Sequence, residues 1–194
     1  MILVAAILVS IVVALLRGGQ FAGLSGTPLR WGALAVASFA IQALLIYQPP
    51  SRKVVGVWGW QELLSVSSHV LLLAVVWANG RLAGIRWIGL GLLLNLAVMV
   101  ANGGWMPISP DAIVKAGHMS LVPSLASGTR VFSSKSIILA LGETRLWFLS
   151  DVFVLARPFP VPSVFSVGDV LVALGVFGFL QDAMLRHQEQ IRSH

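Results

Sequence analysis

The sequence predicts an all-α, polytopic membrane protein with about five transmembrane helices and a membrane-associated extracytoplasmic segment between the fourth and the fifth. Of its 194 residues, 57% are hydrophobic and only 10% are charged, whereas soluble domains carry about 25% charged residues. Apolar runs recur along the chain, each close to the length that crosses about 30 Å of hydrocarbon. A chain of this size is expected to form a single integral membrane domain, residues 1–194.

Five apolar runs are expected to form the spans. They lie at about residues 2–16, 31–47, 63–78, 87–101 and 164–180. Backbone groups in hydrocarbon must be hydrogen-bonded within the protein, and runs without strand alternation cannot close a barrel, so each run is predicted to be a helix. The first run has no cation before it and lacks a persuasive cleavage site, so it is interpreted as an uncleaved span.

Cations in the short loops favour an N-terminus outside and a C-terminus in the cytoplasm. The cytoplasmic side would then carry Arg17, Arg30, Arg81, Arg86, Arg186 and Arg192, against Arg52 and Lys53 in the short outer loop. The formal net charge of +6 is spread singly between apolar runs and forms no basic stripe, so no nucleic-acid partner is expected. The expected partner is the lipid bilayer.

Two pairs of Arg and Trp begin the second and the fourth predicted spans, in Leu29-Arg30-Trp31-Gly32 and Ile85-Arg86-Trp87-Ile88-Gly89. Both spans run in the same direction through the membrane. The repeat indicates either a duplicated helix pair or a shared need for a cytoplasmic Arg-Trp anchor. The seven tryptophans mostly fall at predicted span ends, which is typical of an interfacial aromatic belt.

Polar chemistry inside the predicted spans is sparse. The chain has no cysteine and four histidines, so disulfides and thiolate chemistry are excluded and neither a metal nor a cofactor is expected. Gln42, His69 and Asn95 lie within the spans, and each should face a neighbouring helix because a polar group facing lipid costs free energy. Interhelical hydrogen bonding is the ordinary role, and a proton relay or ligand contact is the alternative for His69.

The segment from residue 102 to residue 163 opens with a helix end. Asn102-Gly103-Gly104 is expected to end the fourth helix, because the glycines can adopt the left-handed conformation. Asn102 could equally present its amide to a site at the outer interface. Ser109 and Pro110 predict a new helix that starts there and runs to about Gly117, with Ser at the N-cap and Pro at the first helical position.

The rest of this segment is predicted to be irregular. Residues 120–136 are rich in Ser and should form a loop. Residues 136–141 and 145–155 are apolar but too short to span, so they are expected to lie on the outer leaflet or dip into it. Residues 157–162 contain three prolines and are interpreted as an extended connector. His118 lies in this segment as a candidate base.

Asp151 and Asp169, at the outer mouth of the last predicted span, are the candidate catalytic residues. Ser166 and Asp169 have the spacing of a capping box, which alone explains Asp169. Asp151 could pair with Arg145 or Arg157 at the membrane surface. Alternatively, the two carboxyl groups converge, share one proton and act as acid and base on a water molecule.

The last of these segments resembles a known catalytic motif. Phe165-Ser166-Val167-Gly168-Asp169, followed by a helix containing Gly175, is similar to the Phe-Asn-x-Ala-Asp motif of lipoprotein signal peptidases (signal peptidase II), with Ser166 in place of the motif Asn. Asp151 stands where that family has its first catalytic Asp, and Asn102-Gly103-Gly104 resembles its Asn-x-Gly motif. The resemblance implies a membrane-embedded aspartyl hydrolase in which Asn102 positions a water or a carbonyl.

A second resemblance covers more of the chain. Three blocks, Asn102-Gly103-Gly104-Trp105-Met106-Pro107, residues 144–151 and residues 165–169, together resemble a domain-of-unknown-function family of small bacterial membrane proteins. This resemblance implies a multi-pass protein of the bacterial plasma membrane in which the three blocks belong together.

These observations are compatible with three functions. The first is a non-enzymatic scaffold or accessory subunit that binds a lipid, a peptide or another membrane protein through an outer polar cluster. The second is the aspartyl hydrolase, and the third is a transporter component. The residues expected to bind or position a ligand are Asn102, Gly103, Gly104, His118, Arg145 and Ser166.

Overall fold

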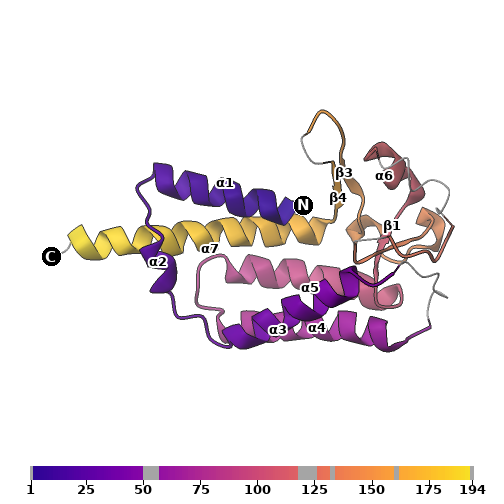
Figure 1. Ribbon diagram of the computed structural model, residues 1–194, viewed down its shortest axis with the longest axis horizontal. Helices are drawn as coiled ribbons and strands as arrows, with labels where there is room; N and C mark the ends of the chain where they lie inside the picture. Colours follow the sequence, from indigo (N-terminus) through magenta and orange to yellow (C-terminus); the bar gives the residue numbers. More distant parts are fainter. Residues whose placement is uncertain (1, 50–56, 118–125, 132–133, 160–161, 193–194) are drawn as a thin grey trace.

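The computed structural model describes residues 2–49, 57–117, 126–131, 134–159 and 162–192, the last six by their backbone alone. Five long helices form a bundle, and short strands and helices gather at one of its ends (Figure 1). The elements in chain order are α1 (Ile2–Leu16), α2 (Ala22–Ser25), α3 (Gly32–Ile46), α4 (Trp60–Ala78), α5 (Ile85–Ala101), β1 (Met106–Ile108), α6 (Pro110–Lys115), β2 (Ser136–Ile138), η2 (Leu141–Glu143), η3 (Trp147–Leu149), β3 (Phe153–Leu155), β4 (Ser163–Phe165) and α7 (Val167–Arg192).

The last helix, α7, lies between α1 and α5 (Figure 1). It packs against α1 and α5, while α3 packs on α4 and α4 on α5 (Figure 1). By length and composition α4 and residues 167–186 of α7 are long and apolar enough to cross a membrane, whereas α1, α3 and α5 are apolar but shorter. The mostly helical prediction is therefore confirmed, and five membrane crossings stay a prediction.

The all-α prediction is wrong at one end of the bundle, where two small sheets lie. Strands β1 and β2 pair in parallel, and β3 and β4 pair in antiparallel. The last predicted span also begins later than expected, because residues 163–165 are strand and the helix starts at Val167. Three-residue strands carry too little alternation to be distinguished from loop by sequence pattern.

The strands, α6, η2 and η3 form a cap over the helix ends, and this cap has its own apolar core. Ile108, Ala112, Ile113 and Ile138 form one buried cluster, and Trp105, Ile137 and Leu139 join Leu45 of α3 in another. Ile137, Ile138 and Leu139 are each at most 2% exposed. The expectation that residues 136–141 lie on the outer leaflet is wrong for these three side chains, which pack inside the protein.

Glycines bring α5 and α7 into close contact. The two helices run antiparallel (Figure 1), and Gly84 faces Gly175 while Gly91 faces Gly168. An added Cβ would lie 2.0 Å from the Gly175 carbonyl oxygen at Gly84 and 2.4 Å from the Gly168 carbonyl oxygen at Gly91. Small residues at such crossings let helix backbones approach closely. This approach places the start of α7 beside Asn95 of α5.

Candidate functional site

The start of α7 is held by the predicted capping box, which is confirmed. Ser166 Oγ accepts a hydrogen bond from the Asp169 backbone N–H at 3.0 Å, and Asp169 Oδ2 accepts one from the Ser166 backbone N–H at 3.3 Å. The reciprocal bonds satisfy two N–H groups that the first helical turn leaves unpaired. Asp169 is thus fixed at the strand end of the bundle, half-buried.

Asn95 ties this cap to α5. Its Nδ2 donates to Asp169 Oδ1 at 2.9 Å, and its Oδ1 accepts from Ser166 Oγ at 2.9 Å. The expected interhelical role of Asn95 is confirmed. Both oxygens of the Asp169 carboxylate consequently accept hydrogen bonds from N–H donors.

The antiparallel pair β3 and β4 determines where Asp151 lies. Phe153 pairs with Phe165 in this register, and their rings stack with centroids 5.6 Å apart. Asp151 precedes Phe153 by two residues, and Asp169 follows Phe165 by four. The hairpin therefore returns the chain so that both aspartates occur at the same end of the bundle.

Asp151 is buried within the cap, with 7% of its surface exposed. Its backbone N–H donates to the Pro107 carbonyl at 3.1 Å. Its Oδ2 accepts from Ser136 Oγ at 3.0 Å, and Ser136 Oγ accepts in turn from Ser134 Oγ at 2.9 Å. The hydroxyl groups of Ser134 and Ser136 thus form a hydrogen-bonded chain that ends at the Asp151 carboxyl group. The ion pair expected with Arg145 or Arg157 is not formed among the described residues.

The pKa of Asp151 is raised to about 7, first by burial and then by the negative charge of Asp169, while Lys135 and the Ser136 hydrogen bond act in the opposite direction. Loss of hydration disfavours the charged form of a carboxyl group, and a second carboxylate nearby has the same effect. The two aspartates therefore interact electrostatically. At neutral pH Asp151 is divided between its protonated and ionised forms.

Asn102 caps α5 and does not present a free amide. Its Nδ2 donates to the Val98 and Arg145 carbonyls, both at 2.8 Å, and its Oδ1 accepts from the Arg145 backbone N–H at 2.9 Å. These three bonds hold the side chain inside the protein, and a ligand-positioning role for Asn102 stays a prediction. Gly103 and Gly104, both with positive φ, confirm the predicted helix end.

Replacing Asn102 with Ala is expected to lower the free energy of unfolding by about 2–4 kcal/mol, since buried polar groups left without partners cost about 1–3 kcal/mol each. Thermal melting in an uncharged detergent measures the effect. Asn102→Asp keeps the acceptor for Arg145 and removes both donated bonds, so it should also melt below the wild type. A wild-type melting temperature for the Ala variant would show that this clamp contributes nothing.

Three further residues that the sequence singled out are His118, His69 and Arg145. His118 lies outside the described residues. His69 is buried in α4, where its Nδ1 is 2.9 Å from the Ser65 carbonyl of the same helix. Arg145 contributes its backbone to the Asn102 clamp, and its side chain is exposed. Among the described residues, no group of three or more His, Asp or Glu side chains could hold a metal ion.

Sequence reasoning missed a buried charged cluster around Trp105, which is 1% exposed and not part of an interfacial belt. Trp105 Nε1 donates to Glu62 Oε1 at 2.8 Å, and the guanidinium of Arg130 lies 4.5 Å from the centre of its ring. Glu62 Oε2 also accepts from the Gly59 backbone N–H at 2.9 Å. The spacing of Gly59 and Glu62 before an apolar run is the signal that could have identified Glu62 as a capping acid.

Arg130 fastens the loop that follows residue 126 to the bundle. Its Nη2 donates to the Leu45 carbonyl of α3 at 2.6 Å. Burial lowers the pKa of Arg130, and the charge of Glu62 opposes that change. Nothing in the polar sequence of this loop distinguishes Arg130 from a solvated residue, because its burial depends on the position of α3.

The fold and the site define a bundle of apolar helices capped by two small sheets, with two interacting aspartates where the cap meets the bundle. The chain belongs to DUF5317, a family of unknown function, which it matches over residues 26–181. This membership confirms the resemblance to a domain-of-unknown-function family. The resemblance to lipoprotein signal peptidases is not shown by the comparisons.

A similar protein comes from Thermotoga maritima, where it is described as an uncharacterized protein. It is 32% identical over 121 residues, which cover 62% of this chain and 64% of the relative. The match thus spans less than two thirds of the relative's length. No solved structure matches the chain.

Proposed function

We propose that the protein is a multi-pass protein of the bacterial plasma membrane that hydrolyses an amide or ester at the outer membrane surface, with Asp169 as the base and Asp151 as the acid. The observation that carries this proposal is the electrostatic interaction between two carboxyl groups that lie in different environments. Asp151 is buried with a raised pKa, while Asp169 accepts hydrogen bonds on both oxygens. Two neighbouring carboxyl groups held in such different environments are typical of a general acid and a general base.

The membrane part of the proposal is supported by the surface of the helices. Large apolar side chains on several helices are strongly exposed, including Leu8, Leu16, Val36, Phe39 and Trp77. Soluble monomers rarely expose contiguous apolar patches on this scale. Among the short loops, those at the end opposite the cap carry Arg17, Arg30, Arg81 and Arg86, against Arg52 and Lys53 in the loop between α3 and α4. This difference favours a cytoplasmic position for that end and an outer position for the aspartates.

In the proposed reaction a water molecule held by the aspartates attacks the carbonyl carbon of the substrate. Asp169 takes a proton from the water, and protonated Asp151 donates its proton to the carbonyl oxygen, which gives a neutral diol intermediate. When the intermediate collapses, the bond to the leaving group breaks and that group takes the proton from Asp169. One hydroxyl group of the intermediate returns its proton to Asp151, so both side chains are restored.

The test uses a bacterial strain lacking its own copy of the protein and complemented with the full chain. Asp151→Asn and Asp169→Asn are each expected to lower processing of at least one membrane protein by 100-fold or more, since acid and base catalysis contribute about 100-fold to 10,000-fold each. Quantitative proteomics of the membrane fraction measures the uncleaved and cleaved forms. Thermal melting of each purified variant checks that it folds.

Asp111→Asn is the matched control, because Asp111 is an exposed aspartate of α6 in the same cap. It should process substrates like the wild type. Wild-type processing by both folded variants at positions 151 and 169 would contradict the hydrolase. The non-enzymatic scaffold or accessory subunit would then be the better proposal for the same outer cluster.

A further inference from the structure

A second polar site lies at the opposite end of the bundle from the cap. The loop before α3 and the turn between α4 and α5 enclose an open pocket of about 690 Å³, which is within the range of small-molecule sites, roughly 300–1,000 Å³. We name it the arginine pocket. Its lining includes three arginines, two tryptophans and one asparagine: Arg30, Arg81, Arg86, Trp31, Trp77 and Asn79.

Both Arg-Trp segments of the sequence contribute an arginine to this pocket, whereas Trp87 is not among its lining residues. Arg30 and Trp31 enter it from the start of α3, and Arg86 enters from the first turn of α5. The ring of Trp31 lies 6.4 Å from the ring of Trp77, centroid to centroid. Guanidinium groups from two distant segments therefore line one cavity. Neither a duplicated helix pair nor two separate membrane anchors would require this arrangement.

Asn79 holds the walls of the pocket together. It is 4% exposed and caps α4 through a bond from its Nδ2 to the Val75 carbonyl at 2.7 Å. The same amide donates to the Arg30 carbonyl at 2.8 Å and accepts from the Arg30 backbone N–H at 2.9 Å. Because the backbone of Arg30 is clamped at both polar groups, the pocket does not depend on a ligand for its shape.

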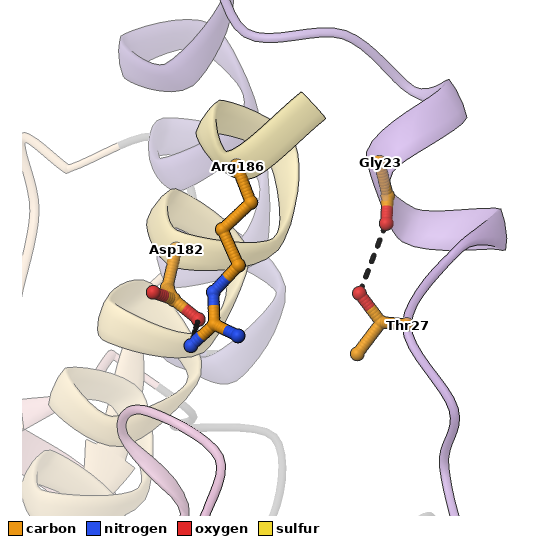
Figure 2. A network of polar contacts seen from close by, with 4 residues as sticks. All are labelled: Gly23, Thr27, Asp182 and Arg186. Carbon is orange, nitrogen blue, oxygen red and sulfur yellow. Dashed lines mark hydrogen bonds and ion pairs between the residues drawn. The ribbon is translucent and has the colours of Figure 1, made fainter. Parts of the chain in front are cut away.

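Among the described residues, the arginines of the arginine pocket have no acidic partner. Within the described parts of the chain, Arg30, Arg81 and Arg86 form no ion pair, whereas Arg186 pairs with Asp182 at 2.7 Å. Figure 2 shows this pair on α7 opposite the bond from Thr27 to the Gly23 carbonyl, in the lining of a neighbouring pocket of about 180 Å³. The charge of Arg186 is thus compensated by Asp182, whereas the described residues provide no ion pair for Arg30, Arg81 and Arg86.

We propose that the arginine pocket binds the phosphate group of an anionic glycerophospholipid. Guanidinium groups match the geometry and charge of phosphate oxygens. Trp77 is 80% exposed, and indoles at a helix end are typical of the headgroup region of a membrane. Basic pockets between helices on the cytoplasmic side bind anionic headgroups elsewhere. The site goes beyond the proposed hydrolase and is independent of it.

The test is native mass spectrometry of the full chain in an uncharged detergent, with phosphatidylglycerol, phosphatidylcholine and inorganic phosphate in separate titrations. One phosphatidylglycerol should stay bound per chain, phosphatidylcholine should not, and millimolar phosphate should fail to displace the lipid. Arg30→Gln, Arg81→Gln and Arg86→Gln should each weaken lipid binding by roughly fivefold, as expected for one cation at an anionic lipid surface. The triple variant should lose about 100-fold.

Arg186→Gln is the matched control, since it removes an arginine at the same end that is already paired. It should bind phosphatidylglycerol like the wild type, and so should Asp151→Asn, which separates this site from the hydrolase. Unchanged lipid binding by the triple variant would overturn the proposal, as would an equal loss in Arg186→Gln. Displacement by phosphate, or binding of phosphate alone, would overturn the lipid assignment and leave a site for a free anion.

Discussion

Asp151→Asn is expected to stabilise the folded protein at alkaline pH. The pKa of Asp151 is raised from 3.8 to about 7, so the folded state holds a proton that the unfolded state releases between about pH 4 and pH 7. Folding stability therefore falls as pH rises through this window and is lowest above it. Each pKa unit corresponds to about 1.4 kcal/mol, which gives a cost on the order of 4 kcal/mol at pH 8.5 that the neutral amide removes.

Thermal melting of the wild type and Asp151→Asn at pH 4, 5.5, 7 and 8.5 measures this effect. The two proteins should melt together near pH 4, and the variant should be increasingly more stable up to pH 7 with a constant difference above. Asp111→Asn, exposed on α6, should show no such growing difference. A variant that is less stable than the wild type at pH 8.5 would show that the Asp151 charge is compensated inside the cap.

A variant that is more stable but inactive would connect the two proposals for Asp151. Buried carboxyl groups that cost folding free energy are retained where their chemistry is needed, and their removal commonly stabilises the protein. Gain of stability together with loss of processing is therefore the combined result that the hydrolase predicts. If Asp151 had only a structural role, Asp151→Asn would process substrates like the wild type.

The second large effect is expected at the glycine pairs between α5 and α7. A Cβ at Gly175 would lie 2.6 Å from the Ile88 backbone nitrogen and 2.7 Å from the Gly84 carbonyl oxygen. Because these are backbone atoms of a packed helix, they cannot move aside without separating α5 from α7. Gly175→Ala is expected to lower the free energy of unfolding by about 1–3 kcal/mol, as for other overpacked interiors.

Gly178→Ala is the matched control on the same helix. Its Cβ would meet nothing closer than 3.7 Å, so it should melt at or slightly above the wild-type temperature, because Ala favours helix over Gly by up to about 1 kcal/mol. Gly84→Ala should be the most destabilised, since its φ of +76° and the 2.0 Å approach to Gly175 both oppose a side chain. Equal melting of the variants at positions 175 and 178 would contradict the close approach.

Local rules accounted for much of what the sequence predicted correctly. Ser109 accepts the hydrogen bond from Ala112 at 3.2 Å at the predicted start of α6, and Ser166 with Asp169 forms the predicted capping box. Caps of this kind depend on residues three positions apart. The long apolar runs became helices for a similar reason, since backbone hydrogen bonds within one segment satisfy its polar groups.

Contacts between distant segments were decided by tertiary structure alone. The sequence could place Asp151 and Asp169 eighteen residues apart (151 to 169). The β3 and β4 pairing returns one toward the other, and burial in the cap together with the charge of Asp169 raises the Asp151 pKa. Likewise the sequence contained Arg30 and Arg86 in two separate Arg-Trp pairs, and the pocket that both arginines line is held by the Asn79 clamp. Residue types and local spacing determine which groups can bind or react, whereas desolvation and proximity arise from packing between segments, which no local pattern encodes.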